Sequence, residues 1–280
     1  IQGYEDSPSE LIFDRAEELL FPDHSIGRNI LGSEESLTRF RNGALETFQI
    51  ENYATDEIVL SVVGQIPFGK IKHAAEKYFG DIPQKSRSRK RVQPQSVSAK
   101  KVVEQRNAYQ RHCMLVGPAY ALPDQKRLQL YLLNNILGGP GMNSRLNLAL
   151  RERRGYSYSA ESHYSPYTDT GVMMIYFSCD PDKFSKSMQV TREEIRKLRN
   201  HQIHDKRLKN ARKQLMGQLA ISRENNEHLM LTSAKSYLVF NRLYSLENIQ
   251  AKLEQITADM LRDTANEVLD PNRLNTLIFE

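Results

Sequence analysis

Apolar positions recur along the chain at helical spacing, and this spacing predicts most of its secondary structure. Phe184, Met188, Thr191, Ile195 and Leu198 follow one another in steps of four and three, which places them along one side of a helix. Other segments repeat the pattern, and several begin with a capping residue and end near Pro or Gly. Helices are therefore predicted over residues 7–21, from Ser36, and over 66–80, 125–137, 182–198, 208–219, 224–240, 245–256 and 257–269.

Shorter apolar runs predict strands. EIVLSVVG (57–64), SYSAESHY (157–164) and GVMMIYFSC (171–179) have this character, and the turn SPYTDTG joins the last two. Residues 101–118 and 273–280 are predicted to contain strands as well. Strands and helices are too irregularly ordered for repeated right-handed βαβ units, so an α+β fold is favoured over a doubly wound sheet.

The same order of elements occurs twice, which predicts two parts of similar build. A buried strand, a short turn and an amphipathic helix follow one another over residues 58–79 and again over 172–198. A polar, basic, proline-spaced stretch lies between these parts, as is typical of a linker. We therefore expect one domain over residues 1–84, a basic linker over 85–100 and a second domain over 101–280.

Length and charge add limited information about function. The chain has 280 residues, enough for two domains with their own cores, and no apolar run approaches the roughly 20 residues of a membrane helix. Part of the net charge of +5 comes from Lys85, Arg87, Arg89, Lys90 and Arg91. A solvated linker is the favoured interpretation of this run. Nucleic-acid binding is disfavoured because no aromatic residues interleave with the charges to stack on bases.

The chain contains no complete catalytic constellation that residue types alone would reveal. Cys113 and Cys179 lie in apolar runs, which predicts buried free thiols, and no C-x-x-C is present. The glycine-rich stretch LGGPGMNSR (137–145) lacks the lysine of a P-loop and follows a helix, so it is predicted to be a turn between two helices. Neither H-E-x-x-H nor H-x-x-E-H nor G-x-S-x-G occurs.

Three stretches taken together resemble a known enzyme family. They are YEDSPSELIFDRAEELLFPDHSIGRNILGSEESL (4–37), IVLSVVGQIPFGKIKHAAEKYFGDIP (58–83) and LGGPGMNSRLNLALRERRGYSYSAESHYSPYTDTG (137–171). Their order and spacing resemble the pitrilysin–insulinase zinc metallopeptidases, and within them the mitochondrial processing peptidase branch and its bacterial relatives. The resemblance covers essentially the whole chain.

The resemblance implies both a fold and a cofactor. Members build a half-clamshell from two related domains, each a largely antiparallel sheet packed against helices, and the first domain would be incomplete here. Zn2+ would be held by two histidines of H-x-x-E-H and by a glutamate that precedes a Y-x-D-x-P pattern, which is Tyr4 to Pro8 in this chain. The ligands are therefore expected at or upstream of Ile1, with Glu5 as the less favoured alternative. This chain alone is expected to be inactive.

The resemblance also implies a role for two residues of the second domain. In similar enzymes an arginine at the start of L-R-E-x-R-G and a tyrosine seven residues later help to hold the substrate, and these are Arg151 and Tyr158 here. Gly155 would permit the sharp turn between them. Without the resemblance, the favoured interpretation is that Arg151 pairs with a surface acid and Tyr158 packs against its neighbours.

Two functions follow from the resemblance. The first is a fragment of a zinc-dependent endopeptidase that hydrolyses peptides or unstructured segments. The alternative is a non-catalytic, peptide-binding subunit that pairs with an active paralogue. In either case the expected partners are a peptide and a second subunit, either another copy or a paralogue, that completes a chamber. Neither nucleic acid nor a membrane is expected as a partner.

Overall fold

The computed structural model describes residues 2–40, 43–87, 91–95, 97–106 and 108–280, so Arg89 and Lys90 of the basic run lie outside the described residues. Contacts divide the chain into two compact units. Unit 1 comprises Ile1–Gly32, Gln93–Leu215 and Gln250–Glu280, and unit 2 comprises Ser33–Val92 and Met216–Ile249. The domain boundaries expected from the sequence stay a prediction.

Unit 1 is built on a five-stranded sheet in the order β1-β5-β2-β4-β3. Only β1 and β5 run parallel; the other neighbouring pairs are antiparallel. The predicted α+β class with a largely antiparallel sheet is therefore confirmed. The strands are β1 (Lys101–Glu104), β2 (Arg111–Ala119), β3 (Ser157–Pro166), β4 (Gly171–Cys179) and β5 (Asn275–Phe279).

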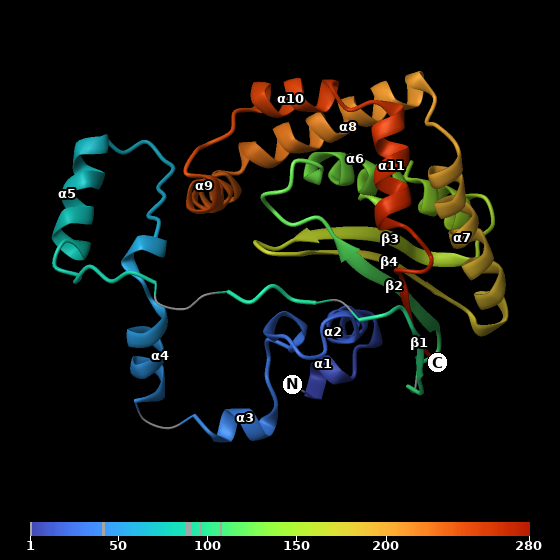
Figure 1. Ribbon diagram of the computed structural model, residues 1–280, viewed down its shortest axis with the longest axis horizontal. Coiled ribbons are helices and arrows are strands. Elements are labelled where there is room, and N and C mark those ends of the chain that lie inside the picture. The colour runs from blue at the N-terminus through green and yellow to red at the C-terminus, as the bar shows by residue number, and fades with distance from the viewer. Residues whose placement is uncertain (1, 41–42, 88–90, 96, 107) are drawn as a thin grey trace. The chain divides into compact units, whose positions relative to one another are not determined.

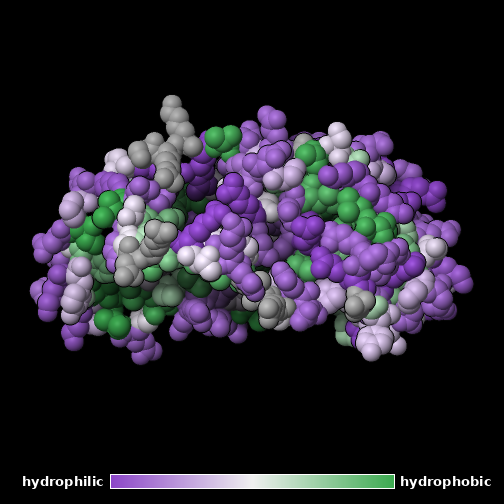
Figure 2. Space-filling view, turned by 90° about the horizontal axis from the view of Figure 1, so that it is seen from below, coloured by the Kyte–Doolittle hydropathy of each residue, from purple (hydrophilic) through white to green (hydrophobic). Residues whose placement is uncertain are grey.

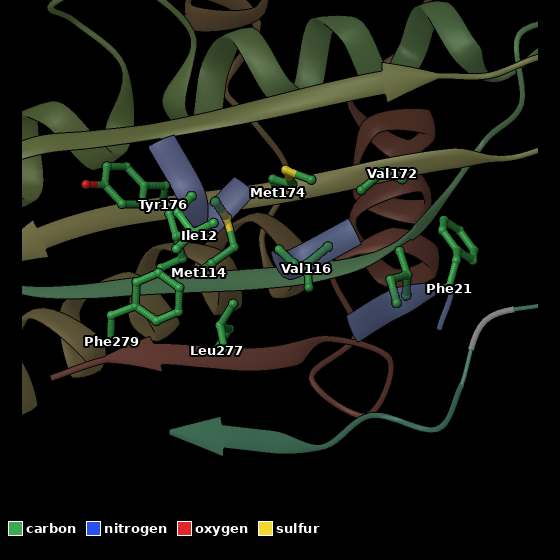
Figure 3. Close-up of a cluster of buried hydrophobic side chains, with 12 residues drawn as sticks. Ile12, Phe21, Met114, Val116, Val172, Met174, Tyr176, Leu277 and Phe279 are labelled. Atoms are coloured by element: carbon green, nitrogen blue, oxygen red, sulfur yellow. The ribbon is translucent and has the colours of Figure 1, made fainter. Parts of the chain in front are cut away.

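Helix α2 (Pro8–Leu20) covers one face of this sheet (Figure 1). Its residues Ile12, Ala16 and Leu20 are four apart and fully buried, because this spacing lines one side of a helix. They pack with side chains of β2, β4 and β5, among them Met114 and Phe279 (Figure 3). Each buried leucine, isoleucine or phenylalanine contributes about 1.5–3 kcal/mol, so this cluster is a main part of the core.

The opposite face is covered by α6 (Arg127–Gly138), α7 (Phe184–Asn200) and α11 (Ala258–Val268), with the short η3 (Asn147–Glu152) beside α7. Side chains alternate along β2, so Cys113 and Leu115 point away from α2 and toward these helices. Cys113 and Cys179 are buried and free, as predicted, and burial raises the pKa of both thiols.

Unit 2 contains helices on which many large apolar side chains are exposed. The predicted helix over 66–80 is present as α5 (Phe68–Phe79), but Phe68 is 78% exposed and Tyr78 is 70% exposed. Figure 2 shows hydrophobic residues, in green, among the hydrophilic ones on one face of the molecule. The remaining elements of the chain are α1 (Gln2–Glu5), η1 (Ser25–Gly27), α3 (Glu34–Thr38), α4 (Ala44–Asn52), η2 (Thr55–Glu57), η4 (Pro181–Lys183), α8 (Asp205–Glu224), α9 (Asn226–Phe240) and α10 (Leu246–Glu254).

Two local predictions were wrong in this part of the chain. Residues 57–64 were expected to form a strand, but they form none, and Ile58 and Leu60 are more than half exposed. A strand exists only through bonds to a partner strand, and none pairs with this segment among the described residues. The predicted helix from Ser36 begins earlier, because the Ser33 hydroxyl accepts a hydrogen bond from the Ser36 backbone N–H and caps α3.

In the part of the chain that the structure describes, none of the helices combines the length and the apolar character needed to cross a membrane.

His112 gives the stability of unit 1 a predicted dependence on pH. Its Nδ1 lies 2.8 Å from the Tyr176 hydroxyl in the interior, and burial lowers the pKa of the imidazole. The unfolded chain therefore binds a proton more readily than the folded one. The contribution of His112 to the free energy of unfolding is fully present above the unfolded pKa of about 6.5. It is lost as the pH drops from there toward the folded-state pKa.

We expect the free energy of unfolding to fall less between about pH 7.5 and about pH 5 in His112→Gln than in wild type. Urea unfolding at both pH values measures this difference. His228→Gln is the control, since His228 is exposed in α9 and should keep the wild-type dependence. An unchanged dependence in His112→Gln would assign the effect to other groups.

Candidate functional site

The glycine-rich stretch 137–145 connects α6 to η3, so the predicted turn between two helices is confirmed. The helix that follows is wound as a π-helix, and the Arg153 N–H donates to the Leu148 carbonyl five residues earlier. π-helical turns of this kind are often found at functional sites. This one carries Arg151 in its last turn.

Gly155 ends the helix and turns the chain into β3. Its φ is +58°, a left-handed conformation that a residue with a side chain adopts only at an energetic cost. In this conformation the Gly155 N–H donates to the Arg151 carbonyl at 2.9 Å, and the Tyr156 N–H donates to the Leu150 carbonyl at 2.8 Å. The predicted role of Gly155 is confirmed.

A β-bulge at the start of β3 determines the direction of Tyr158. Ser157 pairs with Cys179 and Ser159 pairs with Ser178, so Tyr158 is the extra residue between two successive pairs. Without the bulge Tyr158 would lie opposite Cys179 and face the helices, because side chains alternate along a strand. Ser157 takes that inward position instead and is 2% exposed, whereas Tyr158 is 80% exposed.

The Ser157 hydroxyl stabilises the bulge. It lies 2.6 Å from the carbonyl oxygen of Ser159 and 2.6 Å from that of Ser178, and so bridges the bulged strand and its neighbour. Ser157 is not among the functional residues that were predicted from the sequence. A small polar residue in a polar strand gives little signal, and only the register with β4 reveals that it positions Tyr158.

Arg151, in η3, and Tyr158, at the beginning of the edge strand β3, both have exposed side chains. The Arg151 side chain is 51% exposed, and its nearest acid is Glu152, whose Oε1 lies 3.8 Å from Nε. This is a long contact between exposed groups, which contributes little to stability. Among the described residues the two side chains make no hydrogen bond with each other. Both polar ends are therefore accessible to a ligand.

The described residues contain no group of three or more His, Cys, Asp or Glu that could hold a metal ion. Glu5, the alternative zinc ligand, is exposed at the end of α1. The first residues of the basic run are bound to their own unit: the Thr55 N–H donates to the Lys85 carbonyl, and Arg87 pairs with Glu57 at 2.8 Å.

Comparisons with known proteins identify the family to which the chain belongs. Residues 40–215 match the family model described as "Peptidase M16 inactive domain". This match covers more than half of the chain, so the chain belongs to the M16 peptidase family. This agrees with the predicted pitrilysin–insulinase resemblance, while its mitochondrial processing peptidase branch stays a prediction.

Two curated relatives carry the name "uncharacterized zinc protease". One, from Bacillus subtilis, is 28% identical over 99% of this chain and 67% of its own length. The other, from Streptomyces coelicolor, is 28% identical over 95% of this chain and 59% of its own length. The chain therefore spans about three fifths to two thirds of these relatives.

Solved structures show the same fold. The crystal structure of the peptidase M16 inactive domain from Pseudomonas fluorescens matches with a TM-score of 0.90 and 20% identity, over 99% of this chain and 67% of that one. A protease from Helicobacter pylori matches with a TM-score of 0.88 and 17% identity, also over 99% and 67%.

Proposed function

We propose that this chain is the substrate-holding part of a zinc-dependent endopeptidase that hydrolyses peptides and unstructured segments. The zinc ligands would belong to an H-x-x-E-H motif and a further glutamate outside Ile1–Glu280. The bound metal would lower the pKa of a water molecule, and the glutamate of the motif would accept its proton. The observation that supports this proposal is the pair Arg151 and Tyr158, which η3 and the bulge of β3 present to solvent.

Each of the two residues has a definite role in this proposal. The Arg151 guanidinium offers several N–H donors in one plane and can bind two acceptors of a peptide at once. The Tyr158 hydroxyl can donate to the oxygen on which negative charge develops as the peptide carbonyl is attacked. These are interactions of binding and of transition-state stabilisation, so neither residue must itself exchange a proton with the water.

The edge of the sheet would supply the remaining contact with the peptide backbone. β3 is the last strand in the order β1-β5-β2-β4-β3, so one row of its backbone groups has no partner strand in the described sheet. An extended peptide can pair with such an edge. A second subunit, either another copy or a paralogue, would close the chamber around the substrate.

The proposal predicts that activity depends on the rest of the protein. The 280-residue chain alone is expected to leave unstructured peptides intact with or without added Zn2+, because its described residues hold no group that could bind the metal. The longer protein is expected to cleave them, and a chelator should abolish cleavage until Zn2+ is restored. Cleavage of a fluorogenic peptide measures both.

Chelator-sensitive cleavage by the 280-residue chain alone would contradict the proposal. A longer protein that binds the peptide with micromolar affinity but never cleaves it, alone or with a catalytic partner, would favour the non-catalytic subunit instead.

A further inference from the structure

A cavity of about 360 Å³ lies within unit 1, next to η3, the helix that carries Arg151. Residues of α6, η3, α7 and α8 line it, together with Asn143 and Arg145 of the turn before η3. This volume is within the range of sites for small ligands, about 300–1,000 Å³. The cavity is separate from the exposed pair Arg151 and Tyr158, neither of which lines it.

The lining carries an excess of positive charge. It contains four cationic side chains, Arg145, Arg153, Lys197 and Arg207, and one carboxylate, Glu194, so its net charge is 4 − 1 = +3. The rest of the lining is divided between side-chain amides and apolar residues. Such a surface attracts anions and offers many N–H donors but few negatively charged acceptors.

Glu194, the one carboxylate of the lining, pairs with two cations and so cannot neutralise the four positive charges. Glu194 lies 2.8 Å from Lys197 Nζ and 3.6 Å from the nearest guanidinium nitrogen of Arg145. Lys197 has a second partner in Glu193 at 3.0 Å, outside the cavity. Within the described residues the side chains of Arg153 and Arg207 make no ion pair. Three arginines therefore line the cavity, and Glu194, which pairs with Arg145 at 3.6 Å, is the one carboxylate among the lining residues.

Arg145 is the least solvated of these cations. Its side chain is 19% exposed, and burial lowers the pKa of its guanidinium, an effect to which the positive charge of Arg207 adds. An arginine stays charged in proteins, so this position holds a positive charge that has lost much of its water. Glu194, at 3.6 Å and shared with Lys197, compensates only part of the cost of desolvating this charge, and a bound anion would compensate more of it.

We propose that this cavity binds a small organic anion that carries at least two negative charges. Phosphate groups and clustered carboxylates share the required chemistry, because the planar guanidinium groups of Arg145, Arg153 and Arg207 can bind two oxygen atoms of either. The amides of Asn143 and Gln214, which hydrogen-bond to each other at 2.8 Å, lie at the same lining and can orient the ligand. The apolar residues would contact its carbon atoms.

Isothermal titration calorimetry of the 280-residue chain tests the proposal with three probes at equal ionic strength. Pyrophosphate and citrate carry several charges, and acetate carries one. We expect one site per chain for pyrophosphate, for citrate or for both, with acetate at least about tenfold weaker. Preference for pyrophosphate assigns a phosphate ligand, and preference for citrate assigns a polycarboxylate. Equal or absent binding of all three probes overturns the proposal.

Variants locate the site. Arg153→Gln and Arg207→Gln are each expected to weaken binding about tenfold, since each removes charge-assisted hydrogen bonds. Glu194→Gln is expected to strengthen it, because the only carboxylate of the lining becomes neutral at the same size. Arg196→Gln is the matched control, an exposed arginine of α7 that does not line the cavity.

Circular dichroism of each variant would check that it is folded. Weaker binding in Arg196→Gln equal to that in Arg207→Gln would show attraction to the general surface charge and overturn the assignment. The same conclusion would follow if Glu194→Gln bound no more tightly than wild type.

Discussion

In the longer zinc-containing protein, Arg151→Ala is expected to lower kcat/KM for an unstructured peptide by about 100-fold. Two charge-assisted hydrogen bonds contribute about 1.5 kcal/mol each, and their loss of about 3 kcal/mol corresponds to this factor. The fold should survive the substitution. The Arg151 side chain is half exposed, and the bond that ends η3 uses its backbone carbonyl, which alanine retains.

Tyr158→Phe tests the other half of the same prediction. It removes one hydroxyl and leaves the ring on the bulge, so KM should change little while kcat falls about 100-fold, as for the loss of one oxyanion donor. Steady-state kinetics separates the two constants. Arg196→Ala and Tyr109→Phe are the matched controls, since both residues are exposed and lie outside the proposed site. Unchanged turnover in Arg151→Ala and Tyr158→Phe would remove these residues from the site.

The elements of unit 1 could be predicted because their burial follows their sequence pattern. The stripe on α7 includes Thr191, Ile195 and Leu198, and all three are buried against the rest of the unit. The run GVMMIYFSC is apolar on both faces because β4 is covered on one side by α2 and on the other by helices. In both cases the local pattern and the packing specify the same structure.

Residues 57–64 show where this reasoning fails. Their apolar, β-branched composition is that of a buried strand, yet composition cannot supply the partner strand or the covering layer on which a strand depends. Local propensity is a weaker guide than tertiary context for such short segments. The exposed Ile58, Leu60 and Val62 show that this segment lacks that context among the described residues.

The candidate site was predictable only in part. Gly155 could be identified because a helix followed at once by a strand requires a sharp turn, and glycine permits the left-handed conformation. The outward direction of Tyr158 could not, because strict alternation places it on the same face as Ser162 and Tyr164. The bulge that reverses it depends on a register with β4 that no local pattern encodes.

The cationic cavity could not be predicted from the sequence either. Arg145, Lys197 and Arg207 lie on three separate segments, and the sequence around each gives no sign of a binding site. They come together only because the segment before η3, helix α7 and helix α8 line one cavity. A sequence of this length contains many arginines, so charge alone cannot identify the few that meet.

Gly138→Ala is expected to lower the free energy of unfolding by about 3 kcal/mol, toward the upper end of the cost of overpacking. Gly138 ends α6 where this helix approaches β3. A Cβ at this position would lie 2.5 Å from the backbone nitrogen of Ser162 and 2.8 Å from the carbonyl carbon of Glu161. Backbone atoms of a paired strand cannot rotate away as a side chain does, so helix and strand must separate.

Gly217→Ala is the control, because this substitution is expected to raise the free energy of unfolding rather than lower it. Gly217 lies inside α8, and a Cβ would meet no atom within 4 Å. Alanine favours helix over glycine by about 0.8–1.0 kcal/mol, so the variant should be slightly more stable than wild type. Urea unfolding of the two variants beside wild type measures both effects.

The close contact between α6 and β3 at Gly138 also affects the geometry of the proposed site. The turn that carries Arg145 and leads to η3 begins directly after α6, and Tyr158 lies on the strand that Gly138 contacts. A separation of α6 from β3 would therefore displace the Arg151 helix relative to the Tyr158 strand. In the longer protein, Gly138→Ala should lower kcat/KM under conditions where it remains folded, whereas Gly217→Ala should not. Wild-type stability in Gly138→Ala would show that this contact relaxes freely, and the expected loss of kcat/KM in this variant would then have no basis.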